Sequence, residues 1–207
     1  RIGPSSMACT TMTEPGSRLW VALVHHPVRD REGRTVTTSV TNLDVHDLAR
    51  SARTYRAAGL IVITPIEAQR RIVERIVGYW NEPEHAARIP GRREALALVR
   101  TAPSIEAALG IAGPGGAVEL IGTSARPGRD RWSAGQVRQA IHSAPAASRL
   151  LLLGTGWGLA PEVLETCDAV LAPVEEHSDY NHMSVRSAGA VILDRILGSE
   201  SAEVIGT

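Results

Sequence analysis

Small residues between two apolar runs form the part of this sequence best suited to hold a ligand. A run of leucines at 150–153 leads into Gly154-Thr155-Gly156-Trp157-Gly158, and a second apolar run spans 169–173. Glycines let a backbone turn sharply and let a ligand approach the main chain closely. Ligands of open α/β sheets gather at the carboxyl ends of the strands. We therefore expect this glycine turn to line a binding pocket.

Three other segments are expected to meet the glycine turn around a small, partly apolar ligand. Two are ends of apolar runs, at Thr123-Ser124 and at 171–175, and the third is Met183-Ser184, which precedes the last predicted helix. The alternative is that Thr123 and Ser124 are ordinary caps of a strand end. The residues predicted to hold the ligand are Thr123, Ser124, Leu153, Gly154, Thr155, Gly156, Trp157, Gly158, Leu171, Pro173, Met183 and Ser184.

A dinucleotide-binding turn is one alternative for this glycine pattern. The fingerprint G-x-G-x-x-G needs a third glycine at 159, where this sequence has Leu159, and few strands remain after it to complete such a fold. Glu175 and Glu176 do follow about 20 residues later, at the spacing of an acid that binds a ribose. A nucleotide-dependent oxidoreductase therefore stays open as an alternative.

The glycine turn and the segment 181–188 (NHMSVRSA) together resemble the last two motifs of the SPOUT, or α/β-knot, RNA methyltransferases. The branch that they are most similar to is that of the bacterial tRNA guanine-N1 methyltransferase catalytic domain. The resemblance runs from about Leu19 to Leu197. It implies that the pocket binds S-adenosylmethionine, that the chain ends in a deep trefoil knot, and that a homodimer methylates a tRNA or rRNA nucleotide. A non-catalytic knot-fold module for ligand binding or dimerisation is a further alternative.

Arginines recur along the first predicted helix. Arg53 and the threonine after it resemble the first motif of the ribose-methylating SPOUT branch, in which a matching arginine contributes to catalysis. That branch has an asparagine six residues earlier, where this sequence has Asp47. The resemblance implies a catalytic role for Arg53, and we expect Asn42, Arg50 and Arg53 to contact RNA. The alternative is a solvated helix face.

One polar loop contains His177, Asp179 and His182. Zinc would need further ligands, and no cysteine is placed to supply one, so no metal site is predicted. A nucleophile at Ser178 would need a separately positioned base and an orienting acid. Asp179 is instead a candidate general base for a proton on the target nucleotide. The alternative is that Asp179 and Asn181 cap the last helix.

Composition sets the class of protein. The chain has 207 residues, of which 43% are hydrophobic and 21% charged, as expected for one α/β domain with a sizeable core. The formal net charge is zero, so no global basic field marks a nucleic-acid binder. Cys9 and Cys167 form no credible disulfide framework, which favours a reduced, cytoplasmic setting. No apolar run approaches the roughly 20 residues of a membrane span.

Strand-like and helix-like segments alternate along the chain, which predicts a mainly parallel sheet with helices on both faces. We predict a disordered leader at 1–17, the α/β-knot domain at 18–198 and a flexible tail at 199–207. The predicted strands are 19–25, 35–40, 60–63, 95–99, 118–122, 150–153 and 169–173.

The predicted helices carry specific end signals. Asp44 is a plausible N-cap of the first helix, which Gly59 would close, and Ser133 is a plausible N-cap of a later one. The second helix begins at Pro65, and its apolar stripe is predicted to be core. The segment 81–93 is polar and contains two prolines, so it is predicted to be a loop.

Overall fold

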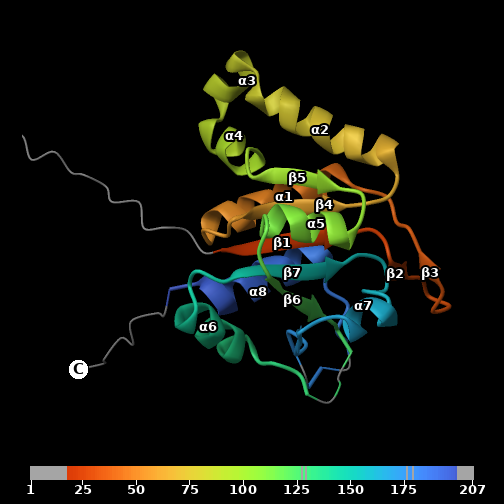
Figure 1. Cartoon of the computed structure of the whole chain (residues 1–207). Helices are drawn as coiled ribbons and strands as arrows, with labels where there is room; N and C mark the ends of the chain where they lie inside the picture. Colours follow the sequence, from red (N-terminus) through yellow and green to blue (C-terminus); the bar gives the residue numbers. More distant parts are fainter. Residues whose placement is uncertain (1–17, 127, 129, 176, 179, 200–207) are drawn as a thin grey trace, which may run out of the picture.

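A six-stranded sheet, parallel throughout, forms the centre of the molecule (Figure 1). The computed structural model describes residues 18–126, 128, 130–175, 177–178, 180–199. The predicted leader, Asp179 and residues 200–207 of the predicted tail lie outside the described residues. The strands of the sheet are β1 (Leu19–Val24), β4 (Gly59–Ile63), β5 (Val99–Ala102), β6 (Val118–Thr123), β7 (Ser148–Gly154) and β8 (Ala169–Leu171), in the order β5-β4-β1-β7-β6-β8.

Helices cover both faces of this sheet, which confirms the predicted α/β class. One layer contains α1 (Asn42–Thr54), α6 (Ala134–Ser143) and α8 (Val185–Leu197), and the opposite layer contains α5 (Ile105–Ala112) and α7 (Pro161–Glu165) (Figure 1). The remaining helices lie near the β5 edge: α2 (Glu67–Asn81), α3 (Pro83–Arg88) and α4 (Pro90–Leu96). A short hairpin pairs β2 (Val28–Arg29) with β3 (Thr35–Val36).

The order of the strands separates this sheet from a dinucleotide-binding fold. Counted along the chain, the six parallel strands are β1, β4, β5, β6, β7 and β8, so their spatial order is third, second, first, fifth, fourth, sixth. A doubly wound dinucleotide sheet places the fourth strand beside the first. Here β7 takes that place and is buried on both faces. The fold therefore gives no support to the oxidoreductase alternative.

The ends of the first helix differ from the prediction. Thr41, not Asp44, is the N-cap, because its side chain accepts the backbone N–H of Asp44. The helix ends at Thr54, well before Gly59, which is the first residue of β4. A Cβ on Gly59 would lie 2.5 Å from the Trp20 ring. Glycine is present there because another side chain comes close, and not because it ends a helix.

The segment predicted to be a loop is helical. Pro83 and Pro90 occupy the first turns of α3 and α4, where a missing N–H costs nothing, so each proline starts a helix. The strand predicted at 95–99 was also wrong, because α4 continues to Leu96 and β5 begins at Val99. The strand predicted at 35–40 is limited to the two residues of β3.

The apolar stripe on α2 is only partly core, contrary to the prediction. Val73 is the buried residue of this helix, whereas Ile66 and Ile72 are 41% and 50% exposed. Ile76, Val77 and Trp80 pack against the core and are partly buried. The helix lies at the edge of the sheet, so only one side of its apolar stripe is covered (Figure 1).

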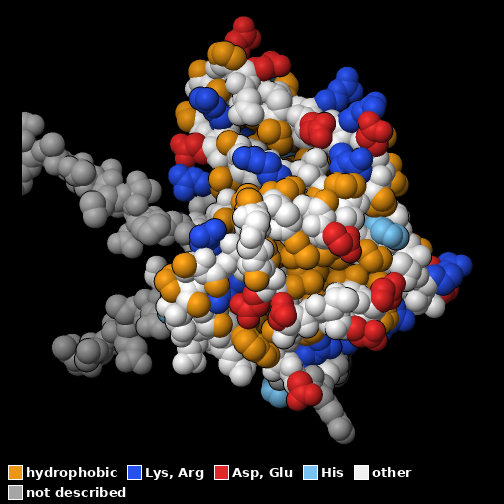
Figure 2. Space-filling model, viewed as in Figure 1, with side chains coloured by type: hydrophobic (Ala, Val, Ile, Leu, Met, Phe, Trp, Pro, Cys, Tyr) orange, Lys and Arg blue, Asp and Glu red, His pale blue; other side chains and the backbone are white. Residues whose placement is uncertain are grey.

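Charged side chains of both signs are interspersed over the face of the molecule that carries α5 and α7 (Figure 2). Hydrophobic side chains gather between those two helices on the same face. Within the described residues, no helix combines the length and the apolar character needed to cross a membrane.

Candidate cofactor and RNA site

The glycine turn after β7 is held by its own backbone and by the β2–β3 hairpin. A Cβ on Gly154 would lie 2.5 Å from the backbone nitrogen five residues later, and Gly156 and Gly158 have φ of +60° and +97°. The N–H of Trp157 donates to the carbonyl of Arg29 at 3.0 Å, and the N–H of Arg29 donates to the carbonyl of Gly158 at 2.9 Å. Residues with a Cβ adopt such conformations only at a cost, so the shape of the turn itself requires glycine.

A buried chain of side-chain hydrogen bonds supports the turn from behind. The Thr155 hydroxyl donates to the Val24 carbonyl at 2.9 Å, so it accepts from the Thr38 hydroxyl. Thr38 in turn accepts from Nδ1–H of His25 at 2.9 Å, a tautomer that the direction of the chain assigns. Burial lowers the pKa of His25 from 6.5 to about 4, against a smaller opposite effect of Asp44. The imidazole of His25 is therefore neutral at pH 7, and its Nδ1–H tautomer fits this series of hydrogen bonds.

Sequence reasoning missed this support. His25 was interpreted only as the end of a strand, and Thr38 was not singled out. Thr38 and Thr155 are 117 residues apart, so no local spacing relates them. Only the pairing of β1 with β7 brings the ends of these segments together.

A cavity of about 900 Å³ opens where the turn meets four other segments. These are the hairpin, the first turn of α1, the loop that follows β6 and the loop that precedes α8. The predicted ligand residues that line this cavity are Thr123, Ser124, Leu153, Gly154, Thr155, Gly156, Trp157, Gly158, Met183 and Ser184. Segments far apart in the sequence thus meet at the carboxyl ends of β6 and β7, where the topology places a ligand.

Leu171 and Pro173 line a different, smaller hollow of about 270 Å³. Ala172 and Val174 line this hollow as well, and they also line the larger cavity at the glycine turn. Successive side chains of an extended segment point to opposite sides, which is consistent with Ala172 and Val174 facing the larger cavity while Leu171 and Pro173 do not. The sequence identified the segment, but it did not identify which of its residues face the ligand.

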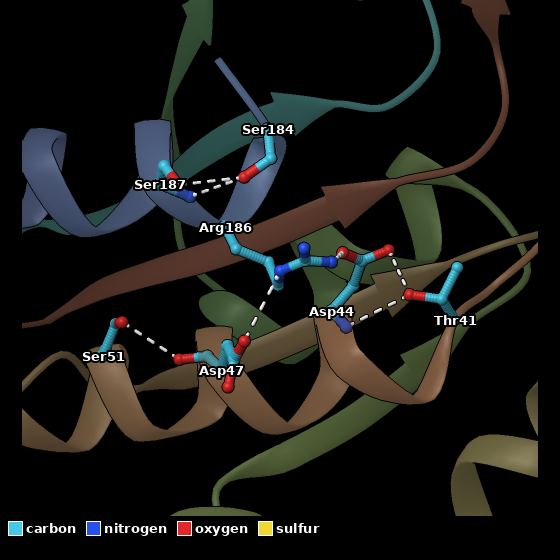
Figure 3. A network of polar contacts seen from close by, with 7 residues as sticks. All are labelled: Thr41, Asp44, Asp47, Ser51, Ser184, Arg186 and Ser187. Atoms are coloured by element: carbon cyan, nitrogen blue, oxygen red, sulfur yellow. Dashed lines mark hydrogen bonds and ion pairs between the residues drawn. The ribbon is translucent and has the colours of Figure 1, made fainter.

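An ion-pair network joins the start of α8 to α1 beside the cavity (Figure 3). Arg186 donates to Asp44 at 2.8 Å and lies 3.4 Å from Asp47, and Asp44 also accepts the Thr41 hydroxyl at 2.6 Å. Ser184 is the N-cap of α8 and accepts the backbone N–H of Ser187. Because Asp44 is buried and Arg186 is part-buried, this network holds two walls of the cavity together.

Comparisons with known proteins agree with this geometry. Residues 18–198 match the family described as SAM-dependent RNA methyltransferase. This chain belongs to the SAM-dependent RNA methyltransferase family. A tRNA (guanine-N(1)-)-methyltransferase from Oleidesulfovibrio alaskensis is 41% identical over 191 residues, covering 91% of this chain and 44% of that protein. The chain thus spans less than half the length of this curated relative.

Two other comparisons extend the family assignment. An uncharacterized protein from Aquifex aeolicus is 35% identical over 180 residues, and the match covers 86% of this chain and 87% of that protein. The SpoU methyltransferase AviRb from Streptomyces viridochromogenes, solved with AdoMet, has a TM-score of 0.54 at 16% identity, covering 88% of this chain and 57% of that one. At 16% identity, the similarity to AviRb shows a shared fold, which is that of the SPOUT methyltransferases.

The cavity at the glycine turn suits S-adenosylmethionine by size and by lining. Sites for ligands of this size have volumes of about 300–1,000 Å³. Adenine needs apolar surface for its faces and main-chain groups along its edge. Leu153 and Met183 offer apolar surface, and the glycine turn offers main chain without side chains in front of it. We expect these residues to hold the cofactor.

Positively charged arginines line part of the cavity at the glycine turn. Arg29, Arg126 and Arg131 line it, and Asp44, which is paired with Arg186, is the carboxylate among its described lining residues. The Nε atoms of Arg29 and Arg131 are buried and have no hydrogen-bond partner among the described residues. Buried, unpaired guanidinium donors favour an anionic ligand group, such as a phosphate. None of these three arginines was predicted from the sequence.

The residues predicted to contact RNA lie outside this cavity. Asn42 and Arg50 line a second hollow of about 610 Å³ between α1 and α2. Arg53 is exposed and pairs with Glu94 at 3.1 Å, with no place in the lining of either hollow. Within one chain the structure therefore does not place Arg53 at the cavity beside the glycine turn.

Asp179, the predicted general base, is outside the described residues. In the sequence it lies between Ser178 and Asn181, and both of these line the cavity. Asn181 donates to the carbonyls of Ala125 and Glu175, at 3.0 and 3.1 Å, which joins the loops that follow β6 and β8. Within the described part of the chain, no three His, Cys, Asp or Glu side chains gather as a metal site would require.

Proposed function

We propose that this chain transfers a methyl group from S-adenosylmethionine to a nucleotide of RNA, with tRNA as the first substrate to test. One observation carries the proposal: a cofactor-sized space lies at the glycine turn together with Arg29 and Arg131, whose buried Nε atoms have no hydrogen-bond partner among the described residues. The name of the Oleidesulfovibrio alaskensis relative supports tRNA as the substrate class.

Positioning is the main task of the residues around this cavity. When bound, S-adenosylmethionine would supply an electrophilic methyl group: its sulfur–methyl bond would break as the RNA atom bonds to the methyl carbon, and S-adenosylhomocysteine would leave. The hydroxyl chain from His25 holds the glycine turn, and the network of Arg186 holds α8 against α1. Holding two reactants in a fixed orientation removes much of the entropic barrier to their reaction. Arg126 and Arg131 would hold the phosphate of the target nucleotide.

Asp179 is proposed to accept the proton where the attacked atom carries one. The support is its place in the sequence between two residues that line the cavity, Ser178 and Asn181. Asp44 does not suit this role, because Arg186 and Thr41 already occupy its oxygens.

We further propose the trefoil knot and the homodimer that the family resemblance implies, and the cytoplasmic location that the cysteine content favours. The path of the chain supports the knot, because β8 pairs with β6 and α8 then returns to pack against α1 and α6. Ala190 and Val191 on α8 are apolar and only partly buried, which supports an interface there. In such a dimer the partner would complete the site, and Arg53 would act across the interface.

Methyl incorporation into undermodified total RNA tests this proposal. We expect the protein to bind S-adenosylhomocysteine and not NAD, and to transfer labelled methyl to the tRNA fraction; nucleoside mass spectrometry then identifies the base. Binding of S-adenosylhomocysteine without transfer to any RNA would favour the non-catalytic module. Absence of binding would contradict the proposal altogether. Sedimentation equilibrium at micromolar concentration tests the dimer, and a monomer with intact cofactor binding would count against it.

A further inference from the structure

The hollow between α1 and α2 exposes more large apolar side chains than a solvated helix face would. Leu43 is 61% exposed, Ile72 50% and Tyr79 47%, and all three line the same hollow of about 610 Å³. Contiguous exposed apolar surface usually marks a binding site. We call this hollow the α1–α2 groove; its wall also includes Ile76 and Trp80.

The rim of the α1–α2 groove is cationic. Arg50, Arg75 and Arg92 line it, and the carboxylate among its described lining residues is Asp47, which pairs with Arg186. Each of the three arginines therefore adds positive charge that this groove does not neutralise. Apolar surface with a positive rim is complementary to an unpaired nucleotide, whose base is flat and whose phosphate is anionic.

The arginines of the groove also contact or influence its aromatic and histidine side chains. The guanidinium of Arg92 lies 4.8 Å from the centre of the Trp80 ring, in the position of a cation–π contact. Burial lowers the pKa of His46, and Arg92 and Arg50 lower it further against an opposite effect of Asp47. Arg92 and Arg50 therefore lie close enough to His46 to act on it as positive charges.

The groove and the methyl-transfer cavity share the first turn of α1. Thr41 and Asp44 line the cavity, whereas Asn42 and His46 line the groove on another side of the same helix. A helix with its side chains is about 10–12 Å across, so only the width of α1 separates the two hollows at this turn.

We propose that the α1–α2 groove binds a nucleotide of the substrate RNA that neighbours the methylated one. The base lies against the exposed apolar side chains of the groove, Leu43 and Ile72, and Arg50 and Arg75 hold the flanking phosphates. This inference rests on the proposed function and assigns the groove as its second RNA subsite.

Fluorescence anisotropy with a short, unstructured, fluorescein-labelled RNA tests the groove. The variant Arg50→Gln/Arg75→Gln should bind this RNA at least roughly tenfold more weakly, the equivalent of about 1.4 kcal/mol. Two lost phosphate contacts should also reduce the slope of log affinity against log salt by about 1.4. Affinity for S-adenosylhomocysteine should stay at the wild-type value, because neither arginine lines the cofactor cavity.

Arg18→Gln is the matched control for the loss of charge. Arg18 is exposed and precedes β1, at the opposite end of the strand from the cofactor cavity, and we expect its RNA affinity to stay within twofold of wild type. Equal RNA affinity in the double variant and in wild type would overturn the inference while leaving methyl transfer, measured separately, to support the proposed function. If Leu43→Ser/Ile72→Ser instead converts a dimer to a monomer, the groove is a protein interface and the inference is wrong.

Discussion

The two hollows that meet at the first turn of α1 are built in different ways. The cofactor cavity is shaped by main chain: a glycine turn, two positive φ angles and a buried chain of hydroxyl groups behind them. The α1–α2 groove is shaped by side chains that project from regular helices, with Trp80 and three arginines as its main features. The cavity therefore depends on backbone conformation, whereas the groove depends on side-chain chemistry.

This difference predicts different responses to mutation. A substitution at the cavity moves several backbone segments at once, because the turn, the hairpin and β1 share hydrogen bonds. A substitution at the groove removes one contact and leaves its helix intact. Pairs of matched substitutions, one at a residue that supports the cavity and one on the helices that form the groove, measure this contrast.

Gly154→Ala and Gly78→Ala form the pair with the largest expected difference. A Cβ on Gly154 would meet backbone atoms at 2.5 and 2.8 Å, and relieving such overlap costs about 3 kcal/mol of unfolding free energy. Gly78 lies in α2 with no atom near its Cβ position, so alanine there should stabilise the helix by about 0.5–1 kcal/mol. Urea unfolding measures both, and equal stabilities for the two variants would contradict the contrast.

His25 and His46, whose pKa values are both lowered, form the second pair of substitution sites. The folded protein holds the pKa of His25 near 4, below the value of 6.5 in the unfolded chain. The unfolded chain therefore takes up this proton first, so the free energy of unfolding falls as the pH drops from 6.5 towards 4, by up to about 3 kcal/mol. His46 has a shift in the same direction.

Urea unfolding at pH 7.5 and pH 5 tests the pH prediction. His25→Gln should remove more of the pH dependence than His46→Gln, because His25 is fully buried and His46 is only partly so. RNA binding should raise the pKa of His46, since a phosphate nearby favours the charged imidazole, and leave that of His25 unchanged. A pH dependence that survives unchanged in His25→Gln would show that the buried hydroxyl chain does not hold a neutral histidine.

Arg186→Met and Arg53→Met compare two ion pairs of α1. Loss of Arg186 leaves the buried carboxylate of Asp44 without its cation, which should lower the free energy of unfolding by about 1–3 kcal/mol. Loss of Arg53 breaks a pair with Glu94 in which both side chains are more than half exposed, so the cost should be under about 1 kcal/mol. Similar losses in the two variants would mean that the network in Figure 3 does not brace the cavity.

The same contrast explains how much of the molecule the sequence could predict. Strands such as 60–63 and 118–122 were predicted because a buried strand is an uninterrupted apolar run, and the cap at Ser133 because its motif is local. The glycine turn and Met183-Ser184 were found because small residues in loops are visible in the sequence. These features depend on neighbours along the chain.

Features that depend on distant segments could not be predicted in this way. The position of α2 at the sheet edge leaves Ile72 exposed, yet its helical periodicity is the same as that of a core helix. Arg29, Arg126 and Arg131 were missed because nothing in their local sequence shows that they meet at one cavity. In the sheet β7 lies between β1 and β6, although β6 comes before β7 in the sequence. This order likewise follows from the whole topology and not from the sequence of either strand.

Calorimetric titration of S-adenosylhomocysteine into Gly156→Val tests the central claim most directly. Gly156 has φ +60°, and a Cβ there would lie 3.0 Å from the Arg29 carbonyl oxygen and 3.3 Å from Thr38. Strain of about 1–3 kcal/mol should displace the turn, and binding should weaken by at least roughly tenfold, or about 1.4 kcal/mol. A variant that is folded by circular dichroism and binds like wild type would remove the glycine turn from the cofactor site.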